Sequence, residues 1–565
     1  MPSGNDDATR YLCAASYLDP AYNTRVIKEF LVEPTRPIPP SPGVDASRVL
    51  TEAVRARARR KNYDGMLVLI TLLILGIAWD QPVLYAWILL SAVLSLPGWL
   101  KAAAQQAESN TQPSATKIIV GILVAIGGLF ILAKLFDYFS GSSSSSSYSY
   151  SDSSSYDYSS GSDGSTARLV VAVILAFIAL IITMGERWTL WQLLTTRFKR
   201  GAGQASDGGG SLTGFLTEDF HGQLVRHQEP DQSVAEGAPL IVYRGYNPFV
   251  GSGFRRDGWS MAIPLERAPD GEDEDDDRPQ LTTETLYAHV RGVLERLQSS
   301  GSLSPDHRLR DLTVTEAVFT PAAELVDHLA SPEAVKYLPN LFAPPSTRLP
   351  QDDVDQLRLA PREWARYYLC IRVETWDRDL VLSTFLHLAV DETTLYVEWT
   401  PFVLPPVKAE YRTVDKMRPD SYKPFGQGLL QWLRLPAGVV GGLFNLASWI
   451  RTPKRQSGVI DPDRYGAKES LRELASVNLF TDYFQLVDIE RYEKIIGSRL
   501  LPAIGGMLGE AGFSTAKFDE QASVVINNEI SIAGDNSGDI SQTGRQDGRR
   551  RRRPGQNGSG RKEQR

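Results

Sequence analysis

The residues that come closest to a chemical site form a short loop rich in glycine and arginine. They lie in the stretch NPFVGSGFRR and are Gly251, Ser252, Gly253, Arg255 and Arg256. Successive backbone N–H groups in such a loop can form a nest for an anion, and the two guanidinium groups would add positive charge. The loop joins two predicted strands and opens no helix, so it lacks a helix-terminus contribution. The alternative is a turn whose glycines allow positive φ, with the aromatic side chains packed beneath it.

The rest of the sequence predicts no catalytic residues, no metal site and no cofactor. Gly-Lys is absent as a dipeptide, which excludes a Walker-type loop, and there is no HExxH or GxSxG motif. The two cysteines, Cys13 and Cys370, form no CxxC pair and exclude a disulfide framework or a thiolate zinc site. The acidic run from Asp270 to Asp277 lacks the turn glycine of a calcium loop.

The end of the chain is a basic tail, although the formal net charge of the whole chain is −7. We expect residues 545–565 to be disordered and to attract nucleic acid phosphates or an anionic lipid leaflet. No aromatic residue interleaves the arginines, so base stacking gains no support, and a solubilising or lipid-touching tail is the simpler alternative. The arginine block consists of Arg549, Arg550, Arg551, Arg552 and Arg553.

Long apolar runs predict four membrane spans. Residues 62–100 contain two runs on either side of Asp80-Gln81-Pro82, which is turn chemistry, and so indicate a helical hairpin. A re-entrant or interfacial hairpin is the alternative, because its first arm is short. Residues 117–136 and 167–186 predict one further span each, since a soluble helix rarely stays apolar on every face for this length.

The basic residues predict the sidedness of these spans. They cluster before the first span, in the loop between the second and third spans, and after the fourth, so the N and C termini are expected in the cytoplasm of a multi-pass protein of the cell membrane. Residues 1–61 are then a partly disordered cytoplasmic leader with a short helix around Thr24–Val32. The Ser/Tyr-rich residues 137–166 form an extracytoplasmic loop, and residues 187–212 form a cytoplasmic linker.

Residues 213–520 predict a cytoplasmic α+β domain of one or two units. Strand-like runs at 366–375, 380–390 and 394–404 are joined by short acidic turns, which favours an antiparallel β-meander. Helical spacing appears from Glu284 to Gln298, and Asp482 is a good cap for a further helix. Strands and helices occur in separate blocks, as is typical of α+β folds. Residues 521–544 alternate apolar and polar side chains and predict a short β-like segment.

The segment from Leu435 to Ile450 is uncharged and has three interpretations. It is a core helix of the domain, a helix lying in the membrane interface, or a fifth span. The interfacial interpretation rests on its tryptophans and flanking charge, and its membrane-contacting residues would be Trp432, Trp449 and Arg451.

Four stretches resemble a family of multi-pass membrane proteins from high-GC actinobacteria. They are RYLCAASYLD (Arg10–Asp19), NPFVGSGFRRDGWSMAIPL (Asn247–Leu265), YYLCIRVETWDRDLVLSTFLHLAV (Tyr367–Val390) and VLPPVKAEYRTVD (Val403–Asp415). That family has no assigned activity, so the resemblance implies membership and no functional residue.

The fold class expected is therefore a four-span α-helical membrane protein with a cytoplasmic α+β domain. The favoured function is a membrane-tethered interaction scaffold or sensory-regulatory protein that contacts the bilayer, anionic lipid headgroups and an unidentified protein partner. Nucleic acid is a partner only through the basic tail. The alternatives are a subunit of a transport or channel assembly and a membrane-bound enzyme of unrecognised class. Against transport, the spans hold almost no ionisable residue.

Overall fold

The fold is that of a computed structural model, which describes residues 7–33, 35–108, 163–201, 237–268, 279–447 and 460–535. Two compact units make up the chain, and each combines segments that lie far apart in the sequence. The first unit is Met1–Asp257, Glu295–His387 and Thr400–Ile495, and the second is Gly258–Leu294, Leu388–Trp399 and Ile496–Arg565.

The first unit begins with three helices, α1 (Asp7–Leu18), α2 (Pro20–Phe30) and α3 (Ala46–Ile77). The Asp19 side chain caps α2 by accepting hydrogen bonds from the next turn, and a proline follows at the first helical position. This Asp-Pro signal starts the helix four residues before the predicted Thr24. The region predicted as a partly disordered leader is thus largely helical over its described residues.

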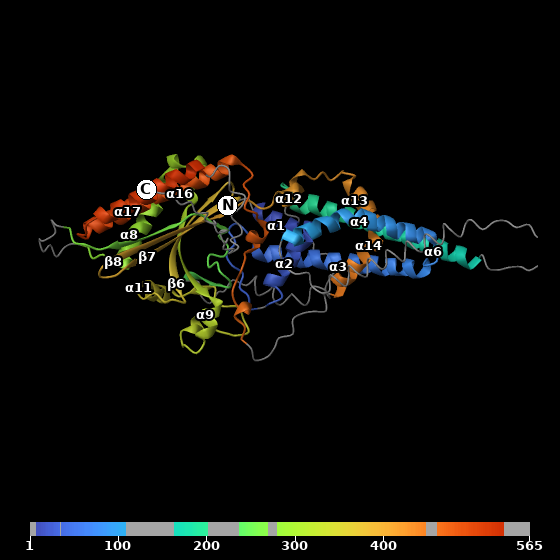
Figure 1. The fold of residues 1–565 in the computed structure, drawn as a ribbon, viewed down its shortest axis with the longest axis horizontal. Helices are drawn as coiled ribbons and strands as arrows, with labels where there is room; N and C mark the ends of the chain where they lie inside the picture. Colours follow the sequence, from blue (N-terminus) through green and yellow to red (C-terminus); the bar gives the residue numbers. More distant parts are fainter. Residues whose placement is uncertain are drawn as a thin grey trace, which may run out of the picture. The chain divides into compact units, whose positions relative to one another are not determined.

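The apolar helices come next in the chain. Helix α3 continues to a turn at 78–81, and the helices α4 (Pro82–Glu108) and α6 (Asp163–Leu193) pack beside α3 (Figure 1). Among the described residues, the helix over Ala167–Phe198 is long and apolar enough to cross a membrane. This confirms the predicted helix at 167–186. The hairpin at 62–100 is seen as two helices, and its insertion into a bilayer stays a prediction. The predicted span at 117–136, the loop residues 137–162 and the tail 545–565 lie outside the described residues.

Polar contacts at both ends show that α3 and α6 run antiparallel. Arg168, at the start of α6, lies 3.6 Å from the Asp80 carboxylate in the turn after α3. At the opposite end, Arg59 of α3 donates to the Glu186 carbonyl at 3.1 Å. The arginines before the first apolar run and those after the last one are therefore at the same end of the helices.

One hydrophobic core of the first unit joins the N-terminal helices to segments between residues 407 and 475. The N-terminal helices pack against the helical turn 194–198 and against two short helices of the C-terminal half, α12 (Ala409–Arg412) and α15 (Leu471–Ala475). Each contributes side chains with little or no exposure to solvent. Representative members of this shared core are Leu12, Ile27, Leu50, Leu194, Tyr411 and Leu471.

Asp415 ties the same elements together by polar contacts. Its carboxylate accepts a hydrogen bond from Arg10 at 2.6 Å and one from the Tyr11 hydroxyl at 2.5 Å. The backbone N–H of Arg200 donates to it at 2.8 Å. Burial would raise the pKa of this carboxyl, but the hydrogen bonds from Arg10, Tyr11 and the Arg200 amide lower the pKa to about 2.

A mixed sheet provides the α+β part, with strand order β2-β8-β7-β6-β4-β1-β5 and β3 paired to β8. Strands β6, β7 and β8 have the predicted bounds and are neighbours in sequence order, and β6 pairs antiparallel with β7. Parallel pairing of β1 with β4 makes the sheet mixed. The α+β class is thus confirmed. The strands are β1 (Ala238–Tyr243), β2 (Phe254–Arg255), β3 (Trp259–Pro264), β4 (Thr313–Pro321), β5 (Arg348–Leu349), β6 (Arg366–Thr375), β7 (Leu380–Val390) and β8 (Thr394–Leu404).

Helices accompany the strands in both units. The predicted helix at 284–298 is α8, followed by a 3₁₀ turn, and the Asp482 side chain accepts from the Phe484 amide at the start of α16 as expected. The remaining helices are α8 (Thr283–Glu295), α9 (Ala322–Asp327), α10 (Ala334–Tyr337), α11 (Gln351–Leu359), α13 (Lys423–Leu433), α14 (Leu435–Ala447), α16 (Tyr483–Glu510) and α17 (Ala516–Asp535).

The predicted β-like segment at 521–544 is wrong where the structure describes it, because residues 516–535 form the helix α17. The helix contacts β3 within the second unit. Phe518 and Ala522 are both buried and lie four residues apart, which places them on one helix face. The alternation of apolar and polar side chains that suggested strands lies beyond Phe518 and Ala522, in residues that continue the same helix.

Asp415 gives a prediction about stability and pH. Its pKa in the folded chain lies below the ordinary value of 3.8. The ionised carboxylate therefore stabilises the fold above about pH 4, and this contribution disappears as the pH falls towards 2. We expect Asp415→Asn to lower the free energy of unfolding by about 2 kcal/mol at pH 7 and to have little effect near pH 2. Denaturant unfolding of the purified full chain in detergent measures this.

The matched control for that variant is Asp420→Asn, because Asp420 is an exposed carboxylate five residues away. It should unfold like the wild type at both pH values. A deficit of equal size at pH 7 and pH 2 for Asp415→Asn would contradict the assignment of the stabilisation to the ionised carboxylate.

Candidate functional site

The Gly251 loop binds an anion that belongs to the chain itself. The backbone N–H groups of Gly251 and Gly253 donate to one carboxylate oxygen of Glu473, at 2.9 and 2.8 Å. The other oxygen of Glu473 accepts from the Ser470 amide at 2.7 Å and completes a capping box for α15. Burial raises the pKa of Glu473, and the three amide donors oppose that shift. The predicted nest is therefore present, but its occupant is internal.

The turn interpretation of the same loop also holds. Gly251 and Gly253 have φ of 96° and 89°. A Cβ at Gly251 would lie 2.2 Å from the Pro40 carbonyl oxygen, and one at Gly253 would lie 2.3 Å from that of Val403. Phe249 packs beneath the loop with its ring centroid 4.0 Å from that of Phe385. The loop thus joins the N-terminal segment, the sheet and α15.

The other predicted loop residues do not converge on an external ligand. Arg256 forms an ion pair with Glu493 at 2.6 Å. Arg255 is exposed on β2, where its backbone pairs with Phe402, and Ser252 is buried. These contacts leave the loop as a structural joint of the first unit.

The ambiguous segment after Trp432 packs on the apolar helices. Helix α14 contacts α3 and α4, and α13 contacts α6. The Trp432 indole N–H donates to the Ala176 carbonyl at 2.8 Å, and its ring lies 5.4 Å from that of Trp87. Trp432 is therefore inside the helical bundle. Residues 448–459, which include Trp449 and Arg451, lie outside the described part of the chain.

Glycines allow these helices to approach one another closely. A Cβ at Gly428 of α13 would lie 2.8 Å from the Met184 Cα of α6. A Cβ at Gly442 of α14 would lie 2.6 Å from Val68 of α3. Small residues at helix contacts in this way are typical of membrane bundles.

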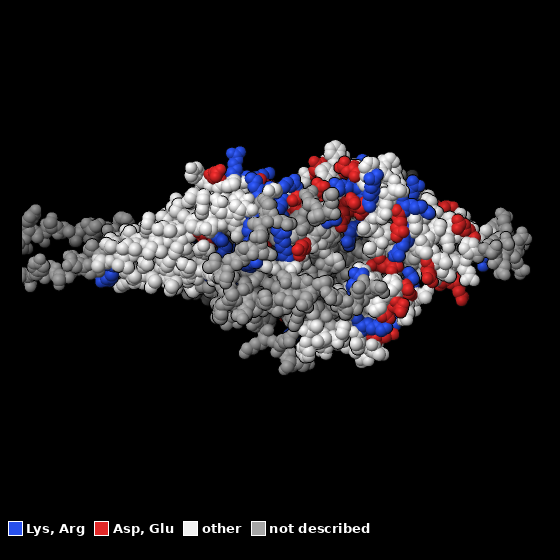
Figure 2. Space-filling model, turned by 180° about the vertical axis from the view of Figure 1, so that it is seen from behind, with Lys and Arg blue, Asp and Glu red and all other residues white. Residues whose placement is uncertain are grey.

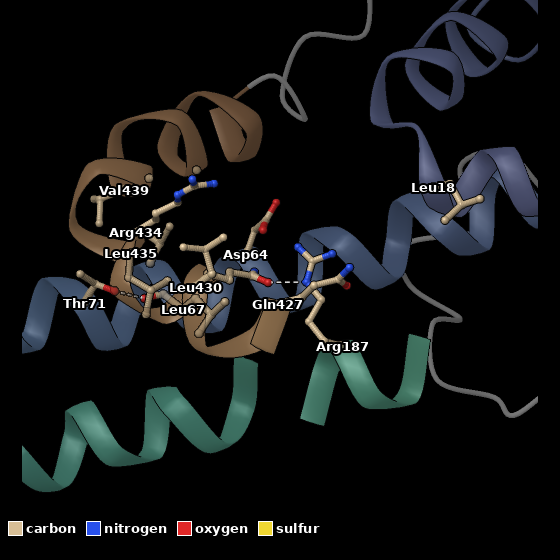
Figure 3. A pocket seen from close by; sticks show the side chains of 14 residues that line it. Leu18, Asp64, Leu67, Thr71, Arg187, Gln427, Leu430, Arg434, Leu435 and Val439 are labelled. Atoms are coloured by element: carbon tan, nitrogen blue, oxygen red, sulfur yellow. Dashed lines mark hydrogen bonds between the residues drawn. The ribbon is translucent and has the colours of Figure 1, made fainter. Parts of the chain in front are cut away.

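A cavity of about 510 Å³ lies between α3, α13 and α14, close to the end of α6 (Figure 3). This volume is within the range of ligand pockets in proteins. Its apolar lining is Leu18, Leu67, Val68, Leu430, Leu435, Gly438, Val439 and Gly442, and its polar lining is Asp64, Thr71, Arg187, Gln427, Gln431 and Arg434.

Some polar groups of the cavity are held in place and others are available. Arg187 Nε donates to the Gln431 side-chain oxygen at 2.6 Å, and the Gln431 amide donates to buried Glu186 at 3.2 Å. Within the described ranges, the Asp64 carboxylate and the Arg434 guanidinium form no hydrogen bond or ion pair with another residue. Figure 3 shows both side chains above the apolar lining. They are free to bind a ligand.

The polar side chains of the cavity are carboxylate, guanidinium, amide and hydroxyl groups. Its lining hydroxyl, on Thr71, donates to the Leu67 carbonyl at 2.6 Å within α3. The lining includes no histidine or cysteine. Within the part of the chain that the structure describes, no three His, Cys, Asp or Glu side chains are placed to hold a metal ion.

Sequence reasoning missed this cavity because its walls come from three distant segments. In the sequence, Asp64 and Arg187 are simply charged residues at the ends of apolar runs. One signal was available: Gly438 and Gly442 are four residues apart and so share one helix face, which marks a place of close approach or open space.

The second unit and parts of the first match a known domain. The family model of the AbeC-like domain matches residues 258–543, just over half of the chain. The chain belongs to the AbeC-like domain family. The matched AbeC-like region includes the β-meander and both cavity helices α13 and α14, whereas Asp64 and Arg187 precede it. No curated protein and no solved structure matches the chain. The actinobacterial, membrane-associated resemblance stays a prediction.

The Gly251 loop gives a second prediction. Replacing Gly251 by alanine combines an unfavourable positive φ with a clash against the Pro40 backbone, so we expect the free energy of unfolding to fall by about 2–4 kcal/mol. Gly245 is the matched control, because it also has positive φ, 90°, but a Cβ there would meet no atom within 4 Å. Gly245→Ala should cost only about 1 kcal/mol.

Thermal unfolding of the purified full chain compares the two variants directly. A similar loss of stability for both would show that the close approach between the loop and the N-terminal segment does not contribute, and would contradict the role of the loop as a joint.

Proposed function

We propose that the chain is a multi-pass membrane protein that holds its α+β region at the cytoplasmic face as an interaction scaffold or regulatory module. The observation that carries the proposal is the exposed apolar surface of α3, α4 and α6. Large apolar side chains on these helices face outward, including Leu69, Leu72, Val83, Val93, Val170, Val173, Ile174, Phe177 and Ile181.

A lipid environment suits such a surface. In Figure 2, the end of the first unit that carries these helices shows almost no Lys, Arg, Asp or Glu, whereas charged side chains are frequent elsewhere on that face. Soluble monomers rarely expose contiguous apolar patches larger than a few hundred Å². A bilayer removes this surface from water, and the helices satisfy their own backbone hydrogen bonds there.

Charge supports a cytoplasmic position for the end of the helical bundle that carries Arg55 and Arg197. Arg55 of α3 and Arg197 after α6 both pair with Glu52, at 2.8 and 3.2 Å. These basic residues lie at the opposite end from the Asp80 turn. Because basic residues are retained in the cytoplasm, the Asp80 turn and the start of α6 are outside and the two chain termini are inside.

The scaffold role follows from how the α+β region is attached. The shared core packs its segments directly on α1, α2 and α3, and α13 packs on α6. The first unit thus couples bundle and sheet through packed side chains rather than through a linker alone. A cavity with unpaired polar groups fits a protein that responds to a ligand.

The membrane placement gives a third prediction. Phe177 is 60% exposed on α6, and Phe342 is 67% exposed in the α+β region. We expect Phe177→Asp to lower the fraction that stays bound after carbonate washing, because a carboxylate at the centre of this span costs about 3 kcal/mol while the other apolar helices remain inserted. Phe342→Asp, the matched control, should leave association unchanged. Flotation of the full chain with vesicles after carbonate washing measures the bound fraction.

The scaffold role is tested by cross-linking the full chain in intact membranes. We expect one cytosolic protein to be captured repeatedly on surface positions of the α+β region, in stoichiometric amount, and to be released when those positions are substituted. Ion flux through reconstituted protein that Asp80→Ala abolishes would instead assign the chain to transport and contradict the proposal.

A further inference from the structure

We propose that the cavity between α3, α13 and α14 binds a single phospholipid whose headgroup carries a hydrogen-bond donor. Its phosphate would lie beside Arg187 and Arg434, its donor would meet Asp64, and an acyl chain would follow the apolar wall of α14. This inference rests on the proposed placement of the apolar helices in a bilayer, and it adds a specific ligand to that placement.

The position of the cavity matches the level of lipid headgroups. Asp64 precedes the apolar run of α3, and Arg187 follows the apolar run of α6. The lining continues from these residues one to two turns into the apolar run, at Leu67, Val68 and Thr71. The cavity therefore extends from the polar boundary of the bundle into its apolar part, as a lipid headgroup and the first part of its chain do.

The charged side chains that line the cavity favour a ligand that carries both a phosphate group and a hydrogen-bond donor. Arg187 has one nitrogen engaged by Gln431, which fixes the plane of its guanidinium, and its remaining N–H groups form no other hydrogen bond among the described residues. Arg434 and Asp64 likewise have no hydrogen-bonding partner there. Two guanidinium groups match an anionic phosphodiester. A half-buried carboxylate that accepts no hydrogen bond favours a donor, such as an ammonium or a hydroxyl group.

The shape of α14 leaves the necessary space. Gly438 lines the cavity, and a Cβ at this position would meet no atom within 4 Å. A larger side chain at Gly438 can therefore occupy the cavity without disturbing the helix contacts. Gly441 is equally unobstructed but does not line the cavity, so it provides a matched control on the same helix.

The experiment measures lipid affinity with the purified full chain in detergent. Native mass spectrometry yields apparent dissociation constants for phosphatidylethanolamine, phosphatidylglycerol and phosphatidylcholine with identical acyl chains. The first two headgroups carry donors, and the choline headgroup has none. We expect the choline lipid to bind about tenfold more weakly, the effect of losing one charge-assisted hydrogen bond.

The variants test each part of the site. Asp64→Asn should weaken the two donor lipids about tenfold and leave the choline lipid unchanged. Arg434→Gln should weaken all three, whereas Lys423→Gln, an exposed charge of α13 outside the cavity, should weaken none. Gly438→Leu should abolish selective binding, and Gly441→Leu should preserve it.

Other results would overturn the inference. Equal binding of the three lipids, or selective binding that survives both Asp64→Asn and Gly438→Leu, would show that the cavity is not the site. Binding of soluble glycerophosphoethanolamine as tightly as the lipid would assign the site to a free phosphate compound. A chain that floats with vesicles but shows no selectivity loses only this proposal, whereas one that does not float loses the proposed function as well.

Discussion

The core shared by the N-terminal helices and residues 407–475 is the interaction on which the first unit depends. Leu12 and Ile27 from the N-terminal helices are packed with Tyr411 and Leu471 from the C-terminal half, and all are almost fully buried. Such cores are close-packed and transmit displacements instead of absorbing them. The apolar helices are therefore fixed to the segments that flank the sheet, and whatever holds the helices also determines where the sheet lies.

Hydrogen-bonded carboxylates reinforce this arrangement, and their contacts distinguish them from Asp64, the carboxylate that lines the cavity. Asp415 and Glu473 each accept several hydrogen bonds that join distant segments, so their charges are satisfied inside the fold. Glu52 is likewise paired with two arginines. Asp64 is the contrast, because its carboxylate lines a cavity without a hydrogen-bonding partner among the described residues. The same chemistry thus stabilises the fold in one place and leaves a group available for a ligand in another.

The sequence predicted helices and strands that arise from local residue patterns. It did not predict the contacts and the cavity that form between segments far apart in the sequence. Apolar runs located α6, and β-branched and aromatic runs between acidic turns gave β6, β7 and β8 to the residue. The glycines at 251 and 253 suggested an amide nest for an anion, and in the structure their amides donate to Glu473, which is more than 200 residues away. The alternation after Val524 suggested strands, although these residues continue a helix that begins at Ala516. The cavity could not be predicted, because a periodic pattern within one segment does not tell which other segment covers it.

The orientation of the apolar helices is the central claim, and single-cysteine labelling tests it most directly. Cys13 and Cys370 are buried, so the reagent does not reach these two thiols. New cysteines are placed singly at Gln81, in the turn, and at exposed Thr196, after α6. In intact cells, the account predicts that a membrane-impermeant thiol reagent labels Gln81→Cys at once and labels Thr196→Cys only after the membrane is opened. Labelling of both positions from the outside, or of neither until the cells are opened, would contradict it.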